Sequence, residues 1–300
     1  MRAVMLEARK ALTMAFLGAA WLALPGGAAM AQTPGAAAFS PPAEAAMPTG
    51  PFGDAVKLGE NIFRNTPKYA PQFTGNTLSC DNCHLDGGRL ANSSPMWAAY
   101  VAYPAYRAKN KKVNNFGERL QGCFRFSENG KAPPLDSTVM VALEAYSFWL
   151  STNAPTGAKL AGRGYPKLAK PAAAPSYQRG QAVYAQNCSL CHGANGAGTM
   201  AHGAVVFPAV WGKDSYNWGA GMSTISNAAD FIHANMPLGM AGTLSTQQAW
   251  DVAAYIDSKD RPQDPRFTGS VAATRAKFHD TPFSLYGTVV NGHVLGGTAQ

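Results

Sequence analysis

CDNCH, residues 80–84, and CSLCH, residues 188–192, share the pattern C-x-x-C-H. Two thiols three positions apart can form thioethers to the two vinyl groups of one haem, while the adjoining histidine binds the iron. A dithiol or zinc site is the alternative for one copy alone. Two copies in 300 residues favour two covalently bound c-type haems. The attachment sites would be Cys80 and Cys83, and Cys188 and Cys191, with His84 and His192 as proximal iron ligands.

The sequence around the motifs repeats as well. KLGENIFRN (57–65) and QRGQAVYAQN (178–187) each place an aromatic residue four positions after a glycine, at Gly59 and Gly180. After each motif, residues 139–151 and 248–258 have the pattern of an amphipathic helix, with Ser137 and Ser245 as expected N-caps. Each half therefore reads as helix, haem motif, loop-rich stretch and closing helix. This predicts an all-α fold of two tandem domains, each similar to a class I cytochrome c.

The N-terminus indicates export. Basic residues precede an apolar run of about 14 residues, shorter than the roughly 20 that span a bilayer, and Ala29-Met30-Ala31 forms an A-x-A cleavage signal. We expect a cleaved signal peptide, a periplasmic location and no stable membrane insertion; an uncleaved anchor is the alternative. The expected division is signal peptide 1–31, flexible leader 32–50, N-terminal cytochrome c domain 51–163, linker 164–176, C-terminal cytochrome c domain 177–262, and tail 263–300, which shows no usable periodicity.

Composition supports a folded protein and argues against a nucleic-acid partner. Hydrophobic residues make up 46% of the chain and charged residues 14%. The formal charge of +8 falls to +6 once the three basic residues and Glu7 of the expected signal peptide are removed. Dense basic runs interleaved with aromatics are lacking, so nucleic-acid binding is not expected.

The second iron needs a distal ligand, and Met236 in FIHANMPLGMAG (231–242) fits because a methionine followed by proline lies just before the closing helix. Met222 and Met240 are rival ligands, and a methionine without this context more often fills gaps in a core. His233 is more plausibly an ordinary helix residue. His202, His279 and His293 are expected to be surface or structural histidines.

The first half has no such methionine loop, but it contains the fifth cysteine, Cys123. Thiolate binds haem iron and favours its ferric state. An unpaired cysteine is often buried and inert, yet an odd thiol in an oxidising compartment is a liability unless it is used. Arg119 and Arg125 flank Cys123, and nearby cations lower a thiol pKa. We expect a functional thiol.

ERLQGCFRFSENGKAPP (118–134) and the second half's ANMPLG resemble the thiosulfate dehydrogenase family of dihaem c-type cytochromes, over roughly residues 51–266. The resemblance implies that His84 and Cys123 ligate the first haem, that Cys123 is also the catalytic residue, and that His192 and Met236 ligate the second haem. Arg119 matches the family's arginine four residues before the cysteine. A second family arginine lies upstream, where Arg107 and Lys109 both stay candidates for contacting substrate. Some members carry a ligand-exchanging lysine beside the methionine; Asn235 stands there, so that exchange is not expected.

The implied reaction joins two thiosulfates into tetrathionate and releases two electrons, which two haems could hold. Arginine suits such oxyanions because it forms paired, charge-assisted hydrogen bonds. A His/Cys haem should have a lower potential than a His/Met haem, so electrons should run to the second haem and then to a soluble or membrane-bound acceptor such as another c-type cytochrome. The alternatives are a tetrathionate reductase running the reverse reaction and a dihaem electron carrier without catalysis. A peroxidase-like enzyme would need an open iron position, against which Cys123 argues.

Overall fold

The computed structural model describes residues 39–202 and 204–297, so the expected signal peptide lies outside the described residues. The described chain is mainly helical, with three short two-stranded sheets. In the described residues, no helix has both the length and the apolar character needed to cross a membrane.

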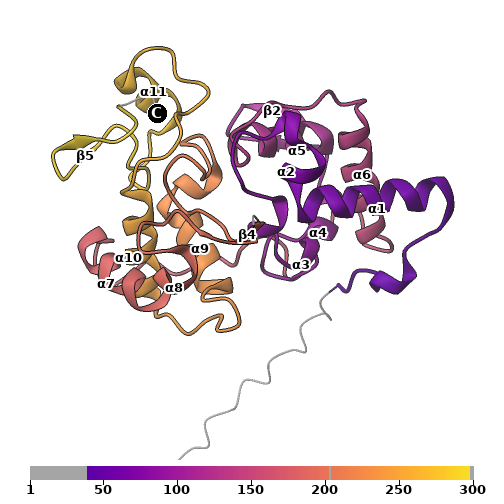
Figure 1. Ribbon diagram of the computed structural model, residues 1–300, viewed down its shortest axis with the longest axis horizontal. Coiled ribbons are helices and arrows are strands. Elements are labelled where there is room, and N and C mark those ends of the chain that lie inside the picture. The colour runs from indigo at the N-terminus through magenta and orange to yellow at the C-terminus, as the bar shows by residue number, and fades with distance from the viewer. Residues whose placement is uncertain (1–38, 203, 298–300) are drawn as a thin grey trace, which may run out of the picture. The chain divides into compact units, whose positions relative to one another are not determined.

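The first half holds the motif of residues 80–84 in a short helical turn between longer helices (Figure 1). Its elements are η1 (Glu44–Ala46), α1 (Gly50–Arg64), α2 (Thr66–Tyr69), η2 (Pro71–Phe73), η3 (Cys80–Asn82), α3 (Leu85–Gly88), α4 (Met96–Tyr100), β1 (Ala105–Arg107), β2 (Lys112–Asn114), α5 (Phe116–Phe126) and α6 (Thr138–Leu150). Strands β1 and β2 pair antiparallel, with Tyr106 opposite Val113.

The second half repeats this order and then continues. Its elements are α7 (Tyr177–Asn187), α8 (Ser189–His192), β3 (Thr199–Ala201), β4 (Ala204–Phe207), η4 (Gly221–Ser223), α9 (Ile225–Asn235), α10 (Thr246–Asp257), α11 (Val271–Phe278), β5 (Val289–Val290) and β6 (His293–Val294). Strand β3 pairs with β4 and β5 with β6, both antiparallel.

A glycine lies at the closest approach of the first and last helix in each half. A Cβ on Gly59 would lie 2.0 Å from the backbone oxygen of Ala142 on α6, and a Cβ on Gly180 would lie 1.9 Å from that of Asp251 on α10. These distances are shorter than any non-bonded contact allows, so only glycine lets each pair of helices cross so closely. The repeated glycine therefore marks the helix crossing in both domains.

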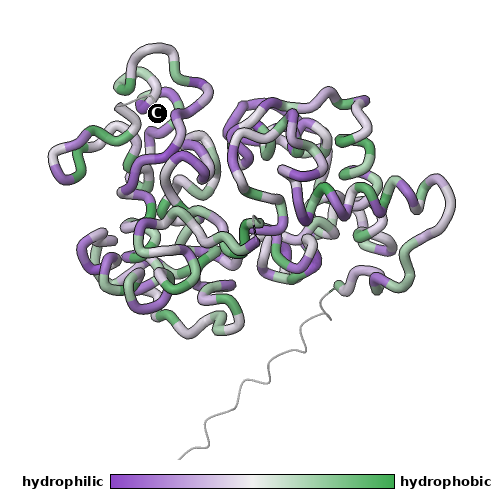
Figure 2. Tube along the Cα trace, viewed as in Figure 1, coloured by the Kyte–Doolittle hydropathy of each residue, from purple (hydrophilic) through white to green (hydrophobic). Residues whose placement is uncertain are grey.

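The apolar faces of these helices form two separate cores. Phe63, Trp97 and Tyr146 belong to the first core, and Tyr184, Trp250 and Tyr255 to the second. Figure 2 shows apolar and polar residues alternating along α1, as expected for a helix with one buried face. The two expected N-caps are confirmed: Ser137 Oγ accepts from Met140 N at 3.4 Å, and Ser245 Oγ from Gln248 N at 3.2 Å.

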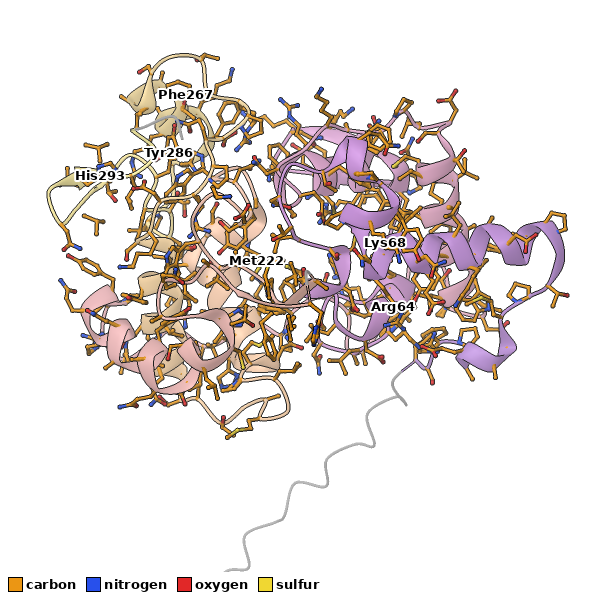
Figure 3. All side chains as sticks on the ribbon, viewed as in Figure 1. Arg64, Lys68, Met222, Phe267, Tyr286 and His293 are labelled. Carbon is orange, nitrogen blue, oxygen red and sulfur yellow. The ribbon has the colours of Figure 1, made fainter. Side chains whose placement is uncertain are left out.

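Residues outside the two repeats also pack. Trp218, Tyr286, Val290 and Leu295 form a third buried cluster, so the C-terminal segment is folded against the second half (Figure 3). At the other end, the ring of Phe39 lies 5.1 Å from that of Trp97. The tail has no usable periodic pattern in its sequence, because its helix is short and its strands span two residues each.

Candidate active site

A cavity of about 630 Å³ opens in the first half beside the C-x-x-C-H motif. Its wall contains both motif cysteines, His84, Arg119 and Cys123, together with apolar side chains such as Met96 and Phe124. The cavity therefore brings together the motif and the odd cysteine, which lie about forty positions apart in the sequence.

His84 is oriented as a metal-binding histidine. Its Nδ1 lies 2.7 Å from the backbone oxygen of Ser94, and because a carbonyl can only accept, Nδ1 carries the proton. His192 repeats this arrangement with the backbone oxygen of Pro208 at 2.9 Å. In each case the carbonyl fixes the ring and leaves the lone pair on Nε2, the arrangement typical of a metal-binding histidine.

The residues fit a c-type haem in both halves. Each motif offers two thiols and a histidine with the required tautomer, and the first half adds an apolar cavity of suitable size. The haems would be held at Cys80 and Cys83 and at Cys188 and Cys191.

Cys123 lies on α5, whose start is fixed by a capping box between Asn115 and Glu118. One helical turn before Cys123, Arg119 Nη1 donates to its Sγ at 2.9 Å. Burial raises the pKa of Cys123, but the charge of Arg119 and the interaction with His84 outweigh it and lower the pKa from 9.0 to about 6. By contrast, burial raises the pKa of Cys83 to about 12 and that of Cys188 to about 11. Cys123 thus differs from these two cysteines of the C-x-x-C-H motifs in favouring the thiolate.

The two upstream candidates are placed differently. Burial lowers the pKa of Arg107, as does the charge of Arg119, whereas the charge of Cys123 raises it, so Arg107 lies within electrostatic reach of the thiol. Lys109 instead donates to the backbone oxygen of Gly219 and lies 4.0 Å from the ring centroid of Phe126. Burial, then the charges of Arg266, Arg119 and Arg107, lower the pKa of Lys109 to about 7. Neither upstream residue lines the cavity.

Several residues that line the cavity were not predicted from the sequence. Arg163, Tyr165 and Lys167 line the wall, although residues 164–176 were expected to be a linker. Glu128 is 2% exposed, and its Oε2 has no partner. Burial and the charge of Cys123 raise the pKa of Glu128 well above its ordinary value, which favours a neutral carboxyl group. No sequence pattern singles these residues out; only the fold brings them to the cavity.

In the second half, Met236 directly follows α9 as its C-cap and packs against the second core, as Cys188 also does. Of the rivals, Met240 is 58% exposed, and Met222, in η4 before α9, packs against the second core as well (Figure 3). His279 is buried and lies 2.9 Å from Asp264 Oδ2, and His202 is exposed.

Comparison with known proteins agrees with the two-domain description. Residues 68–156 match the family model described as the SoxA/TsdA cytochrome c domain, and residues 175–256 match that of cytochrome c oxidase, cbb3-type, subunit III. The chain is 64% identical over 256 residues to a protein named thiosulfate dehydrogenase from Thiomonas intermedia (strain K12), covering 85% of this chain and 82% of the relative. It is 53% identical over 258 residues to a protein named thiosulfate dehydrogenase from Stutzerimonas stutzeri (strain A1501), covering 85% of this chain and 84% of that relative.

A solved structure titled thiosulfate dehydrogenase (TsdBA) from Marichromatium purpuratum, "as isolated" form, superposes with a TM-score of 0.84 at 52% identity. The match covers 88% of this chain but 59% of that one, so the chain spans well under two thirds of the longer protein. The identities and coverage of the full-length relatives settle the family. The chain is a member of the thiosulfate dehydrogenase family, with two cytochrome c domains in tandem.

Proposed function

We propose that this chain is a periplasmic dihaem cytochrome c that oxidises two thiosulfates to tetrathionate at Cys123. The observation that carries the proposal is the Arg119–Cys123 contact of 2.9 Å inside the cavity that also contains His84. In this proposal His84 and Cys123 ligate the first iron, and His192 and Met236 the second.

The chain's own residues bind and orient the substrate. Thiosulfate is a dianion. Arg119 donates to the Cys123 thiol, and the charge of Arg107 acts on the same thiol from outside the cavity wall, so two guanidinium groups favour an oxyanion there. Arg107 is the better upstream candidate because its charge interacts with Cys123, whereas Lys109 is held by Gly219 and Phe126. Lys109 contributes charge to the same cluster.

Two covalent steps at Cys123 convert two thiosulfates into tetrathionate. The Cys123 thiolate and the sulfane sulfur of one thiosulfate form an S–S bond with the loss of two electrons, which gives a cysteine S-thiosulfonate. The sulfane sulfur of a second thiosulfate then attacks the sulfane sulfur of the bound thiosulfate. The new S–S bond completes tetrathionate, and the bond from that sulfur to Cys123 Sγ breaks and returns the thiolate. When bound, each c-type haem supplies a one-electron acceptor, so two haems can take both electrons. The acceptor beyond them would be a soluble or membrane-bound protein such as another c-type cytochrome.

The test is steady-state turnover of the haem-loaded protein with thiosulfate and ferricyanide, measured as tetrathionate formed. Cys123→Gly should abolish turnover, and so should Cys123→Ser, which avoids the cost of about 1 kcal/mol that glycine adds in a helix. Haem content and chemical reduction of the second haem should stay as in the parent. Parent protein that forms no tetrathionate would favour a plain electron carrier. Turnover in both variants would remove Cys123 from the reaction.

A further inference from the structure

The loop of residues 90–95 holds the haem-binding histidine of the first half in place. The backbone oxygen of Ser94 accepts from His84 Nδ1 at 2.7 Å. In the same loop, Ser93 Oγ accepts from Leu85 N at 3.1 Å and donates to Cys83 O at 3.3 Å. Three consecutive residues of the motif region are thus fixed by this one loop, which we call the histidine-orienting loop.

The conformation of this loop is unfavourable by itself. Asn92 has φ 66° and Ser94 φ 50°, both in the left-handed region. Such a conformation in a residue other than glycine costs about 1–3 kcal/mol and persists only where the surroundings hold it. The contacts around the loop are therefore needed for the carbonyl of Ser94 to face His84.

Those contacts come from outside the loop, on two sides. The backbone oxygens of Gly162 and Gly164 accept from Asn92 N at 2.6 Å and Ser94 N at 3.0 Å. From the second half, Asn235 Nδ2 donates to Asn92 O at 3.2 Å.

Asn235 is built into this position. It is 4% exposed, and its Nδ2 also donates to Phe231 O at 3.1 Å within α9, so both amide hydrogens have acceptors. Leu85, which follows the histidine, packs against the second core as well. The second half therefore supports the first haem motif through a partly buried hydrogen bond from Asn235 and an apolar contact with Leu85.

We propose that Asn235 is a positioning residue for the first haem site: its amide fixes the histidine-orienting loop, so that the second half sets how strongly Ser94 O accepts from His84. The inference rests on the proposed function only in taking His84 as the iron ligand. A carbonyl that accepts a hydrogen bond from the ring nitrogen that does not bind iron makes the histidine donate more electron density to the iron, which favours the ferric state. Since Asn235 directly precedes Met236, one helix end then serves both haem sites.

The test compares the full-length, haem-loaded parent with Asn235→Leu, which keeps the volume but removes both donors, and with Asn235→Ala in case leucine prevents folding. Asn227→Ala is the matched control, because Asn227 lies on the same helix and donates to Gly221 O within the second half. Two quantities are measured: the midpoint potential of the first haem and the exchange rate of the His84 Nδ1 proton by NMR.

In the Asn235 variants, the ratio of ferrous to ferric first haem at a fixed potential should rise about threefold. At 59 mV per tenfold for one electron, this raises the midpoint potential of the first haem by about 28 mV. Exchange of the His84 proton should quicken about tenfold. The control should match the parent in both. Parent-like values in the Asn235 variants, or a change confined to the second haem, would overturn the proposal. A parent that fails to oxidise thiosulfate would refute the proposed function alone, because neither readout depends on turnover.

Discussion

Replacing Arg119 with glutamine removes the charge that acts most strongly to lower the pKa of Cys123. Without it, burial raises the pKa and only His84 still lowers it, so we expect the pKa of Cys123 to rise by as much as the three units that separate about 6 from its ordinary 9.0. Three pKa units correspond to about 4 kcal/mol at about 1.4 kcal/mol per unit. At pH 7 the thiolate fraction would fall from about nine tenths to about one hundredth.

The assay is thiosulfate oxidation with ferricyanide between pH 5 and 10. The Arg119→Gln variant should lose about 100-fold in kcat at pH 7 and recover part of it as the pH approaches 9, whereas lost substrate binding would raise KM at every pH. Arg125→Gln is the matched control, because Arg125 is an exposed arginine on the same helix. A variant whose kcat follows the parent's pH profile would refute the reasoning.

Three further predictions concern other residues. Gly180→Ala should lower the unfolding free energy, measured by chemical denaturation, by more than about 3 kcal/mol, because its Cβ would lie 1.9 Å from a backbone oxygen. Gly122→Ala is the control and should cost little, because its Cβ would meet only a side-chain nitrogen at 3.9 Å. Burial and nearby charges lower the pKa of Lys109 from 10.5 to about 7. Between these two values the unfolded chain binds more protons than the folded chain, so the parent should gain stability as the pH rises from about 7 to about 10.5. Lys109→Met should therefore exceed the parent in stability most below pH 7, and an equal difference at pH 6 and 10 would contradict this. Met236→Leu should abolish the far-red absorption band of methionine-ligated ferric haem, and Met240→Leu, at an exposed site, should keep it.

The fold was largely predictable because its signals are local. The C-x-x-C-H spacing, the repeated glycines and the serine N-caps each depend on neighbours within a few positions, and the two tandem cytochrome c domains follow from them. The tail was not predictable, because Tyr286 and Leu295 are buried by a distant tryptophan rather than by a periodic face.

The candidate site was predictable only in part, for the same reason. Cys123 and Arg119 are one helical turn apart, so their contact follows from the sequence once the helix is assumed. Arg163, Tyr165 and Glu128 reach the cavity only through tertiary packing. The choice between Arg107 and Lys109 likewise required the fold, because Lys109 is engaged by Gly219, a residue 110 positions away.

The most direct measurement mixes thiosulfate with the oxidised, haem-loaded protein under anaerobic conditions and without any external acceptor. We predict that the parent reduces its own haems and forms one tetrathionate for every two electrons, and that Cys123→Ser does neither, although a chemical reductant still reduces its second haem. Reduction of the haems by thiosulfate at the parent's rate in Cys123→Ser would contradict the central claim that Cys123 carries the reaction.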